Sequence, residues 1–475
     1  MIASLVLLAA LAGPADDVAT LSKEVDALKK AVSETASQRS VAELEARIER
    51  LSAELAQTRA RNATDEDVRR SIDSLSAQVA ELERRVASLR VRNEDTASGF
   101  PASAHAGYDE GFTLRGNDDG LLLRINAYAQ FRYEGIDVED SRETANASDQ
   151  STFTLPRARL DLTGNAYFPQ LTYRFLVDFT RSPSILDAWA DWSPRPWISI
   201  RAGNFKPPFS RQRQVDSNRL QMIERANATD EFAPRRQLGL EAGTSLWDNR
   251  VHFAAAIQNG NPGPVNDNID FAYAARFTID PLGYLPERDE GDAEYTESPL
   301  VSVGGSFLYN LLPTDAAKIG LSPDVDGNGK LDNVAEWEAG ADMAARWRGA
   351  SIQSELFYRN LDFGKAPPTV NQAGIDRQTT WGTYVQAGYF VLPRRLEIAA
   401  RYSFAQPIDF GLDLTLRPTI PAEINEATFT ITHLIVGRMI KIQAEYTFIE
   451  QDNVPELHGL SRSANRVRAQ LQVGF

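Results

Sequence analysis

Cysteine is absent from the 475 residues of this chain, and histidine occurs only four times. Without cysteine, neither a disulfide framework nor a thiolate metal site is available. The four histidines lie in separate segments, at positions 105, 252, 433 and 458. No Ser-x-x-Lys, Gly-x-Ser-x-Gly or His-Glu-x-x-His motif lies near them, so we expect no enzyme and no required cofactor.

Long apolar runs are also missing. Past the first residues, no run reaches the roughly 18 apolar side chains that a membrane-spanning helix needs. Ile2 to Ala12 is apolar but shorter, and small residues and Asp16-Asp17 follow it. We interpret residues 1–15 as a secretory signal peptide, although no Lys or Arg precedes the apolar part. An exported chain of this kind either dissolves or spans the outer membrane as a β-barrel.

Positive charge is scarce, and the formal net charge is −15. The first hundred residues hold 14 of the 50 basic and 17 of the 65 acidic side chains, which leaves 36 and 48 for the rest. This balance argues against nucleic acid as a partner. Mean hydropathy is −0.34 despite 22 Phe, 14 Tyr and 7 Trp. Such an average fits a membrane barrel, and it fits a large soluble all-β protein equally well.

Glycine and proline do not occur between Ala15 and Ser98. In residues 16–92, apolar side chains recur at alternating spacings of three and four, with charged and small polar residues on the flanks. This pattern predicts an α-helical coiled coil, with a helical hairpin folded on itself as the alternative. The seam leaves the oligomeric state open, and residues 93–107 are interpreted as a linker. The seam residues in the third of its runs are Val68, Ile72, Leu75, Val79, Leu82, Val86 and Leu89.

From residue 108 to 475 the apolar period changes to two, which is typical of strands with two unlike faces. In the stretch from 440 to 448, for example, Ile442, Tyr446 and Phe448 alternate with Lys441 and Glu445. We predict a mainly β, 16-stranded transmembrane antiparallel β-barrel preceded by the coiled coil. The expected strands are 121–133, 155–164, 170–180, 186–192, 197–204, 235–246, 250–258, 270–279, 300–309, 340–347, 350–359, 380–390, 395–404, 426–435, 438–449 and 465–475.

Short and long connections alternate between these strands, as periplasmic turns and external loops do in such barrels. The connection 280–299 breaks the rhythm, because it falls on the short side and is about twenty residues long. Either a strand pair is misread there or the turn is elaborated. A soluble sandwich would not place Arg, Asp, Gln and Lys on the inner face of strand after strand. The last strand ends on Phe475, which resembles the sorting signal of outer-membrane barrels.

Several segments resemble the porin O and P family, the phosphate- and polyphosphate-selective porins. They are Tyr108–Phe112, Asp118–Gly120, Arg157–Arg159, Asp187–Trp189, Arg201–Ser210, Glu224–Ala226 and Pro234–Gly239. The resemblance implies a homotrimeric, anion-preferring diffusion channel in the outer membrane of a Gram-negative-type bacterium, with the coiled coil in the periplasm. Membrane lipid and lipopolysaccharide are then the expected surroundings, and small anions the permeating solutes.

Anion passage needs positive charge along a narrowed path. The connection from Lys206 to Pro234 is the best candidate for an infolded constriction. The residues that we expect along the anion path are Lys206, Arg211, Arg213, Arg157, Arg159, Arg201 and Arg174. The alternative is that these arginines pair with carboxylates and brace the wall, as they do in general porins. A further alternative is a structural envelope protein that tethers the outer membrane to peptidoglycan through the coiled coil, with a non-selective pore.

One external loop resembles an EF-hand calcium loop, because alternate oxygen ligands surround a glycine. The candidate ligands are Asp324, Asp326, Asn328, Lys330 (through its carbonyl) and Asp332. Position 12 holds Ala335 where the pattern has a bidentate Glu. Calcium would order this loop or bridge lipopolysaccharide; a plain Asp/Asn/Gly turn is the alternative.

Overall fold

The computed structural model describes residues 73–80, 104–108, 111–116, 120–140, 149–261, 269–313, 333–362, 377–407, 423–454 and 460–475. Residues 73–80 are helical, and Leu75 and Val79 of the predicted seam are buried there. The signal peptide and the other residues of the predicted coiled coil lie outside the described residues, and the signal peptide and the coiled coil both stay predictions. Within the described ranges, no helix has the length and apolar character to cross a bilayer.

Two short strands that the sequence did not predict precede the barrel in the chain. They are β1 (Ala104–Tyr108) and β2 (Phe112–Gly116), and they pair with each other. Strand β1 overlaps the end of the stretch that we interpreted as a linker. Its backbone is therefore extended and paired over residues that are rich in Ala and Gly.

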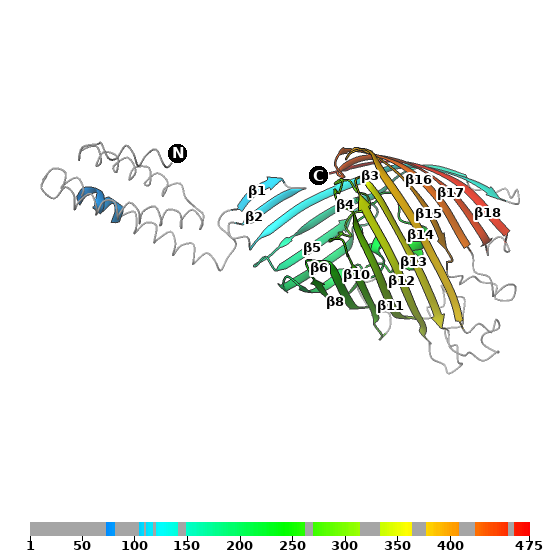
Figure 1. The fold of residues 1–475 in the computed structure, drawn as a ribbon, viewed down its shortest axis with the longest axis horizontal. Coiled ribbons are helices and arrows are strands. Elements are labelled where there is room, and N and C mark those ends of the chain that lie inside the picture. The colour runs from blue at the N-terminus through cyan, green and yellow to red at the C-terminus, as the bar shows by residue number, and fades with distance from the viewer. Residues whose placement is uncertain are drawn as a thin grey trace. The chain divides into compact units, whose positions relative to one another are not determined.

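Sixteen strands in the described part of the chain form a closed antiparallel barrel (Figure 1). Each strand from β3 onward pairs with the next along the chain, and β18 returns to pair with β3, for example at Ala469 and Tyr133. The strands are β3 (Leu122–Asp140), β4 (Gln150–Asn165), β5 (Leu171–Asp178), β6 (Ser184–Arg195), β7 (Ile198–Phe205), β8 (Gln237–Leu246), β9 (Val251–Gln258), β10 (Ala272–Ile279), β11 (Leu300–Pro313), β12 (Asn333–Trp347), β13 (Ala350–Asp362), β14 (Arg377–Leu392), β15 (Leu396–Ala405), β16 (Glu423–Val436), β17 (Ile440–Val454) and β18 (Leu460–Gly474). The predicted number and order of strands are confirmed.

The barrel wall has its polar face inside and its apolar face outside. On β17, the lumenal side chains Lys441 and Glu445 are 2% and 4% exposed, whereas Ile442 and Tyr446 on the other face are 48% and 43% exposed. Because the outward face is apolar along all the strands, it is covered by lipid rather than by protein. The fold therefore places the chain in an outer membrane, and the interior of its barrel is polar.

Two connections that the structure describes turn into the lumen. The first, here called the lumenal segment, comprises residues 206–236 between β7 and β8 and contains the short helices α4 (Arg211–Gln214) and α5 (Asn227–Phe232). The second, here called the turn insertion, comprises residues 280–299 between β10 and β11. The turn insertion contains no strand pair, so the elaborated turn is the correct one of the two sequence interpretations.

Candidate functional site

A carboxylate of the barrel wall binds the first helix of the lumenal segment, α4. Glu355 on β13 accepts the backbone N–H groups of Arg211 and Gln212, at 2.9 and 2.6 Å. The hydroxyl of Ser210 caps α4 by accepting the backbone N–H of Arg213 at 3.1 Å. A negative charge that accepts the free N–H groups of a helical turn stabilises that turn. Glu355 therefore sets where the segment enters the lumen.

Aromatic packing fixes the segment over the same wall. Phe232 of α5 stacks on Phe357 of β13 with ring centroids 5.7 Å apart, and Phe209 lies 6.1 Å from Phe357. All three rings are at most 2% exposed. They form the centre of an apolar cluster with Ala274 and Leu308. This cluster is an apolar core inside an otherwise polar lumen.

The middle of the segment crosses the lumen as irregular backbone, and side chains of the wall satisfy its polar groups. The backbone N–H of Ile223 donates to Glu445 at 2.9 Å, and the carbonyl of Leu220 accepts from Lys441 at 3.0 Å. Unpaired backbone groups in such a site would be costly, so these contacts hold the crossing in one place. The segment makes hydrogen bonds to every strand from β11 to β18.

The seven basic residues expected along the anion path all have a carboxylate partner. The pairs are Arg157–Glu224 (2.5 Å), Arg159–Asp178 (2.7 Å), Arg174–Asp161 (2.7 Å), Arg201–Glu241 (3.1 Å), Lys206–Asp216 (2.9 Å), Arg211–Asp342 (3.0 Å) and Arg213–Asp230 (3.2 Å). These contacts are the ones expected when arginines brace the wall. Four of the seven, at positions 159, 174, 201 and 211, also line a cavity.

The ion pairs of the lumenal segment shift its titrating groups. Burial alone would raise the pKa of Glu224, but Arg157 and Arg132 outweigh burial and bring the pKa to about 2. Burial also acts upward on the pKa of Asp216, and Lys206 and Arg174 outweigh it and hold that pKa well below its usual range. Burial lowers the pKa of Lys206 to about 7, with the Asp216 carboxylate acting in the opposite direction. Glu224 and Asp216 are therefore ionised at neutral pH.

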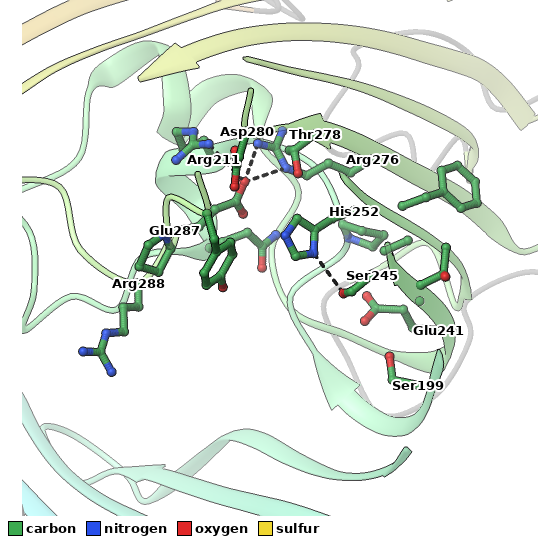
Figure 2. Close-up of a pocket in the computed structure, with 18 of the residues that line it drawn as sticks. Ser199, Arg211, Glu241, Ser245, His252, Arg276, Thr278, Asp280, Glu287 and Arg288 are labelled. Carbon is green, nitrogen blue, oxygen red and sulfur yellow. Dashed lines mark hydrogen bonds and ion pairs between the residues drawn. The ribbon is translucent and has the colours of Figure 1, made fainter. Parts of the chain in front are cut away.

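Among the described residues, two cavities lie in the lumen beside the segment. One has a volume of about 500 Å³ (Figure 2) and the other of about 360 Å³. They are lined mainly by β3 to β10, the lumenal segment and the turn insertion, and they share Arg174, Gln214, Asp216 and Arg288. Both cavities thus lie along β3 to β10, and the lumenal segment and the turn insertion form part of their walls.

The two cavities together are lined by eight arginines and five carboxylates. The arginines are Arg124, Arg159, Arg174, Arg201, Arg211, Arg219, Arg276 and Arg288, and the carboxylates are Asp161, Asp216, Glu241, Asp280 and Glu287. Arginines therefore outnumber carboxylates among the residues that face the cavities, although the whole chain is acidic.

One lining residue escaped the sequence interpretation. Arg288 lies on the turn insertion, where we expected only a turn. The signal that could have found it is the length of the connection between β10 and β11. The calcium-loop residues Asp324 to Asp332 lie outside the described residues, and that site stays a prediction.

A serine and a histidine meet on the wall of the larger cavity. The Oγ of Ser245 lies 2.9 Å from Nδ1 of His252, and Nε2 of the same ring lies 2.7 Å from the carbonyl oxygen of Asn249 (Figure 2). The carbonyl can only accept, so Nε2 donates and Nδ1 accepts the serine hydroxyl. Both ring nitrogens are used in holding the β8–β9 hairpin together.

A closed wall of this size, a polar lumen and an apolar exterior define an outer-membrane channel. The chain belongs to the phosphate-selective porin O and P family, because the sequence model of that family matches residues 125–475. It is therefore a porin.

Individual relatives are distant. A protein of Aquifex aeolicus (strain VF5), described as uncharacterized, is 24% identical over 295 residues, which cover 58% of this chain and 65% of the relative. The match thus spans less than two thirds of that relative's length. The outer membrane channel DcaP of Acinetobacter baumannii has a TM-score of 0.51 at 14% identity, covering 74% of this chain and 97% of that one. OprB of Pseudomonas putida has a TM-score of 0.47 at 9% identity over 75% and 95% of the two chains. At 14% identity, DcaP is similar to this chain in fold alone.

Proposed function

We propose that this porin is an anion-preferring diffusion channel whose solute path runs beside the lumenal segment, along β3 to β10. The segment is hydrogen-bonded to the wall from β11 to β18, and solutes pass through the two cavities that it borders along β3 to β10. The excess of arginines over carboxylates in the lining of these cavities is the observation that supports the proposal most directly.

The balance of charge along the path decides permeation, because an ion responds to the summed field of its surroundings. Most lining arginines are neutralised by a partner at hydrogen-bond distance, as Arg174 is by Asp161. A path of this kind attracts anions without binding one strongly. It favours a general anion preference over a dedicated phosphate site, which would need several cations free to turn toward one phosphate.

Reversal potentials in planar bilayers test this proposal. With a KCl gradient across a bilayer that contains the full-length porin, we expect the sign that corresponds to chloride passing more easily than potassium. A reversal potential of zero or of the opposite sign would remove the anion path. Adding inorganic phosphate to the same bilayer tests phosphate selection separately, because a dedicated site would make low phosphate concentrations block the chloride current.

A further inference from the structure

Hydrogen bonds attach the turn insertion to the barrel wall. The carboxylate of Asp292 in the insertion accepts the backbone N–H of Gly349 at 2.7 Å, and Gly349 lies in the turn between β12 and β13. Within the insertion, Asp280 accepts the backbone N–H of Leu285 at 2.9 Å, and Leu285 is 1% exposed. Arg346 on β12 donates to the carbonyl of Asp289. A turn that served only to connect β10 and β11 would not need these contacts.

The turn insertion is also attached to the lumenal segment. Glu290 accepts the side-chain amide of Gln212 at 2.8 Å and the backbone N–H of Gln221 at 2.7 Å. Asp289 forms an ion pair with Arg219 at 3.2 Å. Glu290 and Asp289 are 3% and 7% exposed. The two connections therefore enter the lumen from opposite ends of the barrel and hold each other in place.

This attachment places Arg288 where the two cavities meet. Arg288 lines both cavities, and its side chain is 58% exposed. Its ion pairs are to Asp289 at 3.4 Å and to Glu294 at 3.6 Å. Both distances are longer than those of a normal N–H···O hydrogen bond. In Figure 2 its guanidinium extends away from Arg211 and Arg276.

The other arginines of this region differ from Arg288 in their pairing. Arg174, which lines the same two cavities, holds Asp161 and Asp216 at 2.7 and 2.8 Å. Arg276 holds Asp342 at 2.6 Å. A charge that is compensated at close range contributes little field to the path, whereas an exposed and loosely paired charge contributes most of its own.

We propose that Arg288 is the residue that determines the charge preference of the pore, and that the turn insertion exists to hold it at the junction of the two cavities. This inference rests on the proposed anion-preferring channel and names the residue responsible. The lumenal segment supplies the narrowing, and the turn insertion supplies the charge that a permeating anion meets there.

The test compares Arg288→Gln and Arg288→Glu with Arg348→Gln in planar bilayers. Arg348 is a matched control, because it is an exposed arginine in a neighbouring turn, stacked 5.2 Å from the Trp347 ring and outside both cavities. We expect Arg288→Gln to lower the anion-to-cation permeability ratio roughly fourfold. One unit charge about 5 Å away, screened at about 0.1 M salt, changes anion and cation entry in opposite directions by about a factor of two each. Arg288→Glu should invert the preference.

The outcomes separate the two proposals. If the unmodified porin prefers anions and the Arg288 variants match the Arg348 control, the role of Arg288 is wrong while the anion path stands. If the unmodified porin shows no preference, both are wrong. Because Arg288 is exposed, its variants should fold, and the shift of the folded band on unheated gels verifies this before conductance is compared.

Discussion

Replacing Glu224 by Gln should loosen the lumenal segment without changing the barrel. Glu224 lies between Arg132 and Arg157, at 2.6 and 2.5 Å, and the side chains of these arginines are 7% and 12% exposed. A glutamine of the same size keeps the packing but removes the charge that both guanidinium groups face. Two positive groups would then lie close together with no anion between them.

The structure gives the size of the effect in two ways. The pKa of Glu224 falls from 4.5 to about 2, and at about 1.4 kcal/mol for each pKa unit the ionised side chain contributes about 3 kcal/mol. Breaking a buried ion pair by removing one partner costs about 3–5 kcal/mol in other proteins. Since the lowered pKa belongs to a carboxylate, this contribution is present above pH 4.5 and is lost as the pH falls toward 2.

Amide hydrogen exchange of the folded porin in detergent measures this loosening. The backbone N–H of Ile223, which donates to Glu445, is buried in the crossing and reports on its opening. A loss of about 3 kcal/mol should speed exchange in the peptide around Ile223 roughly 100-fold. Glu450→Gln, at an exposed carboxylate on β17, is the matched control and should leave exchange unchanged.

The pH dependence provides an independent check on the same reasoning. After correction for the intrinsic exchange rate, the unmodified porin should keep its protection around Ile223 from neutral pH down to about 4 and lose it as the pH approaches 2. Glu224→Gln should lack this step. Equal exchange in Glu224→Gln and the control at neutral pH would refute the idea that this ion pair holds the segment.

Two further substitutions test the attachment of the inward connections. Glu290→Ala removes the carboxylate that accepts from Gln212 and Gln221, one of those that join the turn insertion to the lumenal segment, so single-channel conductance should rise; an unchanged conductance would count against the attachment. Phe357→Ala removes the ring on which Phe232 stacks, which should cost about 3–5 kcal/mol of docking energy and increase current noise as the segment moves. A quiet recording with the original conductance would show that the aromatic cluster does not hold the segment.

The strand positions could be predicted because lipid and water impose opposite demands on the two faces of the wall. Every other residue must be apolar where the strand crosses hydrocarbon, and this pattern is visible in the chain itself. The strand ends were less accurate. The first barrel strand was expected over 121–133 and extends to Asp140, because residues such as Ile136 remain paired with β18 beyond the apolar band. There the neighbouring strand, not the alternation, decides where the strand ends.

The lumenal segment could be located from its length and its arginines. The carboxylate partner of each arginine could not be predicted. Glu224 lies 67 residues from Arg157 in the chain, and Asp342 lies 131 residues from Arg211. No local pattern connects such pairs. The sequence therefore identified basic residues that face the lumen without showing that carboxylates neutralise them.

The alternation of side chains by itself determined that this protein is a barrel with a wet interior, because each strand responds to the lipid and water beside it. Only the tertiary structure decided which charges remain available to a solute. That outcome depends on two connections, 206–236 and 280–299, meeting inside the closed wall. Arg288 was an ordinary turn residue in the sequence, and its place at the junction follows from contacts between segments that lie far apart in the chain.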